Sequence, residues 1–276
     1  MFWQTTRFRI ALNVPRVMGI VNVTPDSFSD GGQFLDSSAA LAHCEQLVRE
    51  GSDILDIGAE SSRPGAAAVS WQDEWQRVQP VLEGALKLGC PVSLDTTKAE
   101  LMQHALDMGV DIINDINALR APGAFAGVVA HGQCGVCLMH MQGQPQSMQT
   151  APEYVDVVAE VNNFLALRVE ALTSQGVAAE RIVLDPGIGF GKTVAHNLEL
   201  LRRQGELRAL GLPLLLGWSR KSTLGVVTGK PSNDRLVASV AAALAAVQRG
   251  ASIVRVHDVA ATVDALKVWK AAGLLG

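Results

Sequence analysis

Residues 92–115 read VSLDTTKAELMQHALDMGVDIIND and contain one complete strand, helix and strand. Residues 92–94 and 112–113 are short apolar runs, and residues 100–108 between them have helical periodicity. Strands this apolar do not leave one face in water, which is typical of parallel strands that helices cover on the outside. The stretch therefore predicts a βαβ unit.

The same cycle recurs along the whole chain. We predict strands at residues 17–23, 54–57, 92–94, 112–113, 136–139, 182–184, 214–216 and 253–256. Helical patterns lie at residues 39–49, 73–88, 100–108, 124–130, 154–174, 196–204, 236–248 and 263–272, with no linker or composition break. Eight cycles favour a single (β/α)8 TIM barrel domain over residues 1–276, and a doubly wound open sheet is the alternative.

Composition and charge narrow the class of protein. The chain is 48% hydrophobic and 18% charged, which indicates a globular fold with a large core and excludes a disordered tail. The net charge of −4 and the lack of basic blocks argue against nucleic acid as a partner. No apolar run approaches the ~20 residues of a membrane helix, and the N-terminus lacks an apolar signal segment. We therefore expect a cytoplasmic protein with no membrane contact.

A C-x-x-C spacing at Cys134 and Cys137, with His140 nearby, could indicate a zinc or redox site. However, these cysteines fall in a predicted strand, where positions three apart point to opposite faces. No second C-x-x-C exists in the sequence. We therefore predict buried, unligated cysteines.

Polar residues concentrate directly after the predicted strands. Because the strand ends of such a barrel converge on one face, where catalytic residues gather, this series predicts the active site. Any one of these residues could instead cap a helix. The series consists of Asn22, Asp56, Glu60, Asp95, Asn114, Asp115, His140, Asp185, Ser219, Arg220, Lys221, Arg255 and His257.

A glycine-rich segment, DPGIGFGKT, follows the sixth predicted strand at residues 185–193. It matches neither a phosphate-binding P-loop nor a dinucleotide fingerprint, since the glycine spacing differs from both. It would let a flat ligand approach the backbone, with Asp185 accepting hydrogen bonds and Phe190 offering an apolar surface. Together with Asp95 and Asn114, Asp185 suits a planar heterocycle that carries N–H and NH2 groups. A divalent metal or a glycosidase carboxylate pair is the alternative.

Basic residues near the same strand ends predict an anion site. Arg255 and His257 lie two residues apart on one predicted strand end, so their side chains share a face and could bind phosphate. Arg63 and Lys221 lie in other loops of the same barrel end. The turn-rich segment at residues 24–32, with Phe28 in it, is interpreted as a lid.

Taken together, these segments resemble the dihydropteroate synthase family, whose members join p-aminobenzoate to 6-hydroxymethyl-7,8-dihydropterin diphosphate. The resemblance runs in order through GIVNVTPDSFSDGG at 19–32, DIGAESSRPG at 56–65, VSLDT at 92–96, IND at 113–115, LMHM at 138–141, LDPGIGFGK at 184–192, SRKS at 219–222 and RVH at 255–257. It implies a transferase of folate biosynthesis that is a homodimer.

The resemblance also implies a role for each site residue. The pterin would be bound by Asp95, Asn114, Asp185, Lys221 and Arg255, with Arg255 stacking on the ring. The diphosphate would be bound by Asn22, Arg63, Arg255 and His257, with Asn22 engaging its Mg²⁺. The p-aminobenzoate would meet Phe28, Asp30, Ser62, Arg63, Pro64, Phe190, Lys221 and Ser222. Position 62 departs from the family, which usually has Thr there, but Ser keeps the hydroxyl.

The implied reaction depends on charge. Mg²⁺ and basic residues would stabilise the departing diphosphate, and Asp95 would stabilise positive charge on the pterin methylene in an SN1-like path. We expect the catalytic residues to be Asp95, Lys221, Arg255 and His257, with no strong general base. Two alternatives remain open: a pterin-binding methyltransferase module that uses methyltetrahydrofolate, and a non-catalytic paralogue.

Overall fold

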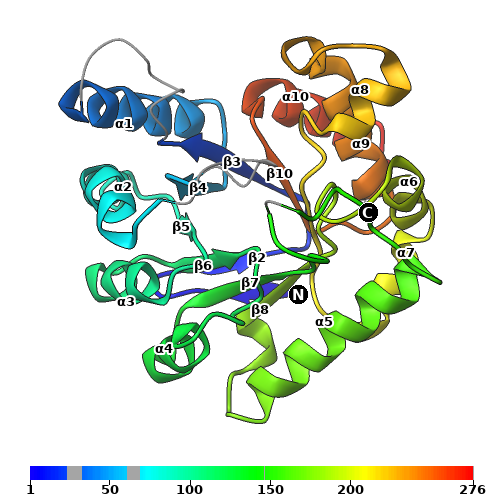
Figure 1. Ribbon diagram of the computed structural model, residues 1–276. Coiled ribbons are helices and arrows are strands. Elements are labelled where there is room, and N and C mark those ends of the chain that lie inside the picture. The colour runs from blue at the N-terminus through cyan, green and yellow to red at the C-terminus, as the bar shows by residue number, and fades with distance from the viewer. Residues whose placement is uncertain (24–32, 61–68, 146, 276) are drawn as a thin grey trace.

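The computed structural model describes residues 1–23, 33–60, 69–145 and 147–275. Its centre is a barrel of eight parallel strands, ordered β8, β7, β6, β5, β4, β3, β10, β9 (Figure 1). An isolated parallel bridge between Leu184 and Leu214 joins the two ends of this order, as a closed barrel requires. The predicted TIM barrel is therefore confirmed. The strands are β3 (Arg16–Asn22), β4 (Ile54–Gly58), β5 (Val92–Asp95), β6 (Ile112–Asp115), β7 (Gly135–Met139), β8 (Ile182–Asp185), β9 (Leu215–Leu216) and β10 (Ile253–Val256).

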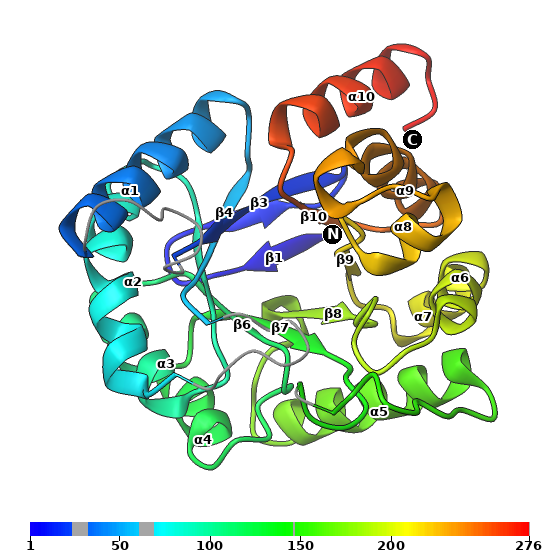
Figure 2. The ribbon, with the colours of Figure 1, turned by 45° about the horizontal axis from the view of Figure 1, so that its top comes forward.

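Helices surround the barrel on its outside (Figure 2). Most of them begin and end within about three residues of the predicted limits, because their apolar faces pack against the strands in one large core cluster, but α1 and α10 begin earlier than predicted, at Gln33 and Val259. Two short helices, α7 and α8, were not predicted from the sequence. The helices are α1 (Gln33–Arg49), α2 (Trp71–Ala85), α3 (Ala99–Met108), α4 (Ala124–His131), α5 (Val157–Thr173), α6 (Val194–Arg202), α7 (Gln204–Leu207), α8 (Ser222–Thr228), α9 (Leu236–Gln248) and α10 (Val259–Ala271).

A β-hairpin that the sequence pattern did not predict packs against the barrel strands. It consists of β1 (Phe2–Gln4) and β2 (Arg9–Ala11), which pair antiparallel. Trp3 is fully buried and belongs to an apolar cluster with Met18, Ile54 and Ile253, which come early in their strands. Its indole Nε1 donates to the Arg181 carbonyl over 2.9 Å. The hairpin therefore covers the amino-terminal end of the barrel.

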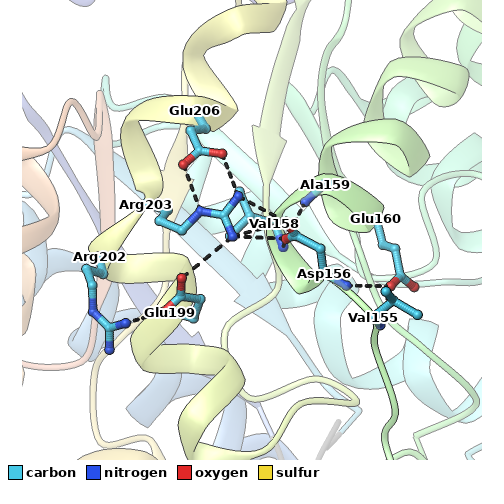
Figure 3. Close-up of polar contacts among 9 residues, drawn as sticks. All are labelled: Val155, Asp156, Val158, Ala159, Glu160, Glu199, Arg202, Arg203 and Glu206. Carbon is cyan, nitrogen blue, oxygen red and sulfur yellow. Dashed lines mark hydrogen bonds and ion pairs between the residues drawn. The ribbon is translucent and has the colours of Figure 1, made fainter.

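An ionic cluster joins the start of α5 to α6 and α7 (Figure 3). Asp156 caps α5 by accepting hydrogen bonds from the Val158 and Ala159 amides. The same carboxylate accepts from Arg203 at 3.1 Å, and Arg203 also pairs with Glu206 at 2.7 Å. Within the described ranges, no helix is both long and apolar enough to span a membrane.

Candidate active site

The pleat of the strands points polar side chains into the carboxyl-terminal end of the barrel. Ile54, Val183 and Ile253 belong to the apolar cluster beneath the barrel's centre. Successive side chains alternate between faces, so residues two positions further along the same strands also point inward. Those residues are Asp56, Asp185 and Arg255. The barrel interior is therefore apolar at one end and charged at the other.

Arg255 is at the centre of this charged end. Its Nε lies 2.5 Å from Oδ2 of Asp56, and its Nη2 lies 2.6 Å from Oδ2 of Asp95. Asp56 is fully buried, whereas the side chains of Arg255 and Asp95 remain about a quarter exposed at 22% and 24%. Burial lowers the pKa of Arg255, but Asp56 and Asp95 outweigh it and hold that pKa above its usual value. The guanidinium is therefore a permanent cation held by two carboxylates.

Asp95 is the more accessible of the two carboxylates. Burial raises the pKa of Asp95 to about 7, while the Arg255 guanidinium acts in the opposite direction. A direct ion pair at 2.6 Å favours the ionised form. Asp95 can therefore present a negative charge beside a bound ligand while it also orients Arg255.

Asn114 and Asp185 complete a ring of hydrogen-bonding groups. Asn114 Nδ2 donates to Oδ2 of Asp56 over 3.0 Å, which leaves its amide oxygen as an acceptor. Asp185 is buried, and its Oδ1 accepts the Gly187 amide over 2.7 Å. Burial raises the pKa of Asp185, against the Gly187 hydrogen bond and the neighbouring Lys221. The structure thus brings the predicted residues Asp95, Asn114, Asp185 and Arg255 together.

The glycine-rich loop shapes one wall of the site. Gly187 has a φ of 70°, and a Cβ there would overlap the His140 carbonyl oxygen. The Lys221 ammonium lies 4.1 Å from the centre of the Phe190 ring, within the range of a cation–π contact. Burial lowers the pKa of Lys221 to about 8, with Arg255 acting in the same direction.

His257 lies beyond Arg255 on the same strand end. Its backbone amide donates to Ser219 Oγ over 3.2 Å, and its Nδ1 lies 3.0 Å from the same oxygen. Burial lowers the pKa of His257 to about 3, with Arg220 and Arg255 acting in the same direction. The ring is therefore neutral at pH 7, and an N–H on Nε2 is compatible with a Ser219 hydroxyl that donates to Nδ1.

Arg220, which belongs to the predicted series of polar residues after the strands, forms an ion pair. Its Nη2 and Nε lie 2.5 and 3.2 Å from the two Asp258 oxygens. Arg220 has a positive φ of 59°, and its amide donates to Ser239 Oγ. This pair ties the loop that carries Lys221 to the loop that follows His257.

The remaining predicted residues fall into two groups. Asn22 is exposed at the end of β3, and Ser222 is exposed at the first position of α8. Phe28, Asp30, Ser62, Arg63 and Pro64 lie outside the described residues, as does the predicted lid at 24–32. In the described part of the chain, no three His, Cys, Asp or Glu side chains form a group that could hold a metal ion.

Asp56 belongs to the series of polar residues that predicts the active site, but the sequence alone assigns it no individual role there. Its one available signal was the DIG sequence that ends a strand. Glu60, in the same series, accepts Lys98 Nζ at 2.8 Å, and Lys98 also pairs with the buried Glu74, so it belongs to a structural ion network. Cys134 and Cys137 are buried free thiols, as predicted.

The barrel and the charged end together define an α/β-barrel enzyme whose site binds an anionic, hydrogen-bonding substrate. The family model of pterin binding enzymes matches residues 18–257. The dihydropteroate synthase of Neisseria meningitidis serogroup B is 54% identical over 278 residues, which cover 99% of this chain and 98% of that protein.

Two solved structures agree with this relationship. Xanthomonas albilineans dihydropteroate synthase with 4-aminobenzoic acid has a TM-score of 0.90 and 50% identity, covering 96% of this chain and 95% of that one. The same organism's enzyme in complex with 7,8-dihydropteroate has a TM-score of 0.90 and 46% identity over 99% of each chain. The chain belongs to the pterin-binding enzyme family and, within it, to the dihydropteroate synthases, which are transferases of folate biosynthesis.

Proposed function

We propose that this chain condenses 6-hydroxymethyl-7,8-dihydropterin diphosphate with p-aminobenzoate to give 7,8-dihydropteroate and diphosphate. The observation that carries the proposal is the convergence of Asp95, Asn114 and Asp185 with Arg255 at one end of the barrel. Carboxylates and an amide oxygen match the N–H and NH2 groups of a pterin. Relatives with bound 4-aminobenzoic acid and 7,8-dihydropteroate support the assignment of substrate and product.

The pterin would lie against the buried acceptors. Asp185 keeps lone pairs free beyond its hydrogen bond to Gly187, and Asn114 keeps its amide oxygen free. Arg255 is held through its Nε and Nη2 by Asp56 and Asp95, so a face of its planar guanidinium can stack on the flat ring. The Lys221 ammonium lies over the Phe190 ring and acts electrostatically on Asp185, so it can donate to a pterin acceptor.

The p-aminobenzoate would lie toward Phe190 and Ser222. The Phe190 ring offers an apolar surface to the benzene ring, and the exposed Ser222 hydroxyl can donate to the carboxylate. By resemblance, Phe28, Asp30, Ser62, Arg63 and Pro64 complete this part of the site.

The diphosphate would meet His257, Arg255 and, by resemblance, Arg63. Asn22 suits Mg²⁺ because it offers an exposed amide oxygen, a hard ligand, and Mg²⁺ often takes few protein ligands when a substrate supplies phosphate oxygens. When bound, Mg²⁺ would neutralise charge on the departing diphosphate. His257 can donate one N–H to the same group without carrying a charge itself.

The reaction needs charge stabilisation rather than a strong base. As the bond to diphosphate breaks, positive charge develops on the pterin methylene, and the Asp95 carboxylate stabilises it. The arylamine attacks as the neutral base and loses its proton afterwards. This is the SN1-like path, and Asp95, Lys221, Arg255 and His257 carry it.

We further propose that the protein is a cytoplasmic homodimer. Four free, buried cysteines within the described residues support a reducing compartment. Large apolar side chains are exposed on α8, α9 and α10, with Val226 at 68%, Val237 at 77% and Val268 at 66%. Light scattering of Val237→Asp beside the unmodified chain tests this, since an unchanged dimer would remove α9 from the interface.

A steady-state assay tests the activity. The purified chain, given pterin diphosphate, p-aminobenzoate and Mg²⁺, should produce dihydropteroate and diphosphate in equal amounts. Omitting either organic substrate should abolish dihydropteroate. A chain that binds pterin but forms no dihydropteroate would instead favour the methyltransferase module or the non-catalytic paralogue.

A further inference from the structure

Lys192 in the glycine-rich loop is a buried cation with an unusual set of partners. Its side chain is 3% exposed, and its Nζ lies 3.0 Å from the carbonyl oxygens of both Gly187 and Phe190. The His140 carbonyl oxygen and Nδ1 lie 3.3 and 2.9 Å from the same atom. Lys192 forms no ion pair with any carboxylate in the described ranges. Among the described residues, the hydrogen-bond partners of the ammonium are therefore three backbone oxygens and one imidazole nitrogen.

The His140 ring is in the neutral form, whose Nδ1 can accept a hydrogen bond from the Lys192 ammonium. Burial lowers the pKa of His140 to about 3, with Lys192 acting in the same direction, so the ring is neutral. Its ring packs edge-on against Phe164 at 5.0 Å between centres. Its backbone amide donates to the Asp185 carbonyl over 2.9 Å. His140 thus anchors both the end of β7 and the Lys192 ammonium.

The carbonyls that Lys192 holds belong to residues that shape the pterin side of the site. The Gly187 amide donates to the Asp185 carboxylate, and the Gly187 carbonyl accepts from the Phe190 amide over 3.1 Å. The Phe190 ring lies below the Lys221 ammonium. Neutralising or removing the Lys192 ammonium would leave the Gly187 and Phe190 carbonyls repelling each other in a buried place.

The charge itself has a second consequence. Burial raises the pKa of Asp185, and Lys192 is one of the cations that act against that rise, along with Lys221 and Arg255. Lys192 therefore helps to keep Asp185 ionised and able to accept pterin N–H groups. Its own burial lowers the pKa of Lys192 to about 7, against Asp185.

We propose that Lys192 is a positioning residue for the pterin-binding part of the site, acting through the Gly187 and Phe190 carbonyls rather than on phosphate. The inference rests on the proposed function, since it assigns Asp185 to the pterin. It explains why a lysine follows the glycines although the segment is not a P-loop: its ammonium points into the protein and is occupied there.

Separate calorimetric titrations with 6-hydroxymethylpterin and with diphosphate plus Mg²⁺ test the proposal. Lys192→Met keeps most of the side-chain volume and removes the donors. We expect it to weaken pterin binding at least about tenfold, because buried acceptors lose their partner. Diphosphate affinity should stay within about threefold, since His257 is held by Ser219 rather than by this loop. A general loss of structure would instead weaken the binding of both ligands.

Tyr154→Phe is the matched control. Tyr154 Oη donates to the Gly191 carbonyl over 2.8 Å, so this variant removes another tie to the same loop without touching Gly187 or Phe190. It should change pterin affinity by less than about threefold. A Tyr154→Phe effect equal to that of Lys192→Met would overturn the specific role of Lys192.

If Lys192→Met does not unfold cooperatively on heating, Lys192→Gln replaces it in the titrations. It keeps two donors but loses the charge and some length, so it should weaken pterin binding less than Met and still leave diphosphate binding unchanged. If the unmodified chain binds pterin and a folded Lys192 variant binds it with equal affinity, this inference is overturned and the proposed function stays intact. If the unmodified chain binds no pterin, both the inference and the proposed function are overturned.

Discussion

Arg255 and Asp56 are 199 residues apart in the sequence, yet the Arg255 Nε donates to Oδ2 of Asp56 over 2.5 Å at the centre of the barrel. Asp56 is fully buried, and its second oxygen has no hydrogen-bond partner among the described residues. The same Oδ2 also accepts from Asn114. Asp56 therefore orients two of the proposed pterin-binding side chains, those of Arg255 and Asn114, although it is less accessible than Asp95.

Replacing Asp56 by Asn should destabilise the fold. The change keeps the shape but leaves the Arg255 cation beside a neutral amide, and breaking a buried pair from one side costs about 3 kcal/mol. Urea unfolding measures it. Asp264→Asn, which removes the exposed pair with Lys267, is the control and should cost less than about 1 kcal/mol. Equal effects of the two changes would show that the buried pair adds nothing special.

Replacing Arg255 by Ala should lower kcat/KM by an amount equivalent to about 3 kcal/mol or more, because truncating a partly buried side chain that pairs with two carboxylates also strands its partners. Lys at the same position should recover only part of the loss, since one ammonium cannot pair with Asp56 and Asp95 and also stack on a ring. Steady-state kinetics with both substrates decide this. Unchanged kinetics in the Ala variant would remove Arg255 from the site.

Replacing Asp185 by Asn should weaken the binding of a pterin ligand by about 2 kcal/mol, because a pterin N–H would then face an amide donor. Calorimetry gives the affinity. Asp115→Asn is a matched control: Asp115 is also buried at a strand end, but its oxygens accept the Asn117 and Leu119 amides, each over 2.7 Å. That variant should lose stability and keep its pterin affinity, and the reverse pattern would contradict the assignment.

The buried His140 predicts acid sensitivity. Burial lowers the pKa of His140 to about 3 in the folded chain from its ordinary value of 6.5, so the unfolded chain binds a proton more readily. Its contribution to stability is present above pH 6.5 and is lost as the pH falls toward 3. In that window the slope for one such group is about 1.4 kcal/mol per pH unit. His140→Gln should flatten the curve of unfolding free energy against pH, and parallel curves for the two chains would contradict this.

Trp3→Ala should cost about 3 to 5 kcal/mol of stability, because it opens a large cavity under the barrel and leaves the Arg181 carbonyl without its donor. The hairpin lies at the opposite end of the barrel from the proposed site. Near its lowered melting temperature the variant will lose activity by unfolding, but well below it kcat should match that of the unmodified chain. A lower kcat in fully folded protein would indicate that the hairpin influences the site.

Most of the fold could be predicted because the information is local. Apolar runs and helical periodicity located the eight barrel strands and most of the helices between them to within about three residues, since burial of each element depends on its own pattern. The β1–β2 hairpin was not predicted because each strand has three residues and buries a single side chain, too few for a pattern. Helices α7 and α8 were not predicted because they are also short.

In the site, too, some features could be predicted from the sequence and others could not. The order of residues shows which side chains follow the strands, and the rule that strand ends converge was enough to bring Asp95, Asn114, Asp185, Lys221 and Arg255 to one end of the barrel. Which of them pair with one another depends on the folded arrangement. Arg255 takes Asp56 and Asp95, Arg220 turns to Asp258, and Lys192 takes carbonyls rather than phosphate. These choices depend on distances across the barrel and on competition among neighbouring charges in a buried place, and neither is encoded in the order of residues along one segment.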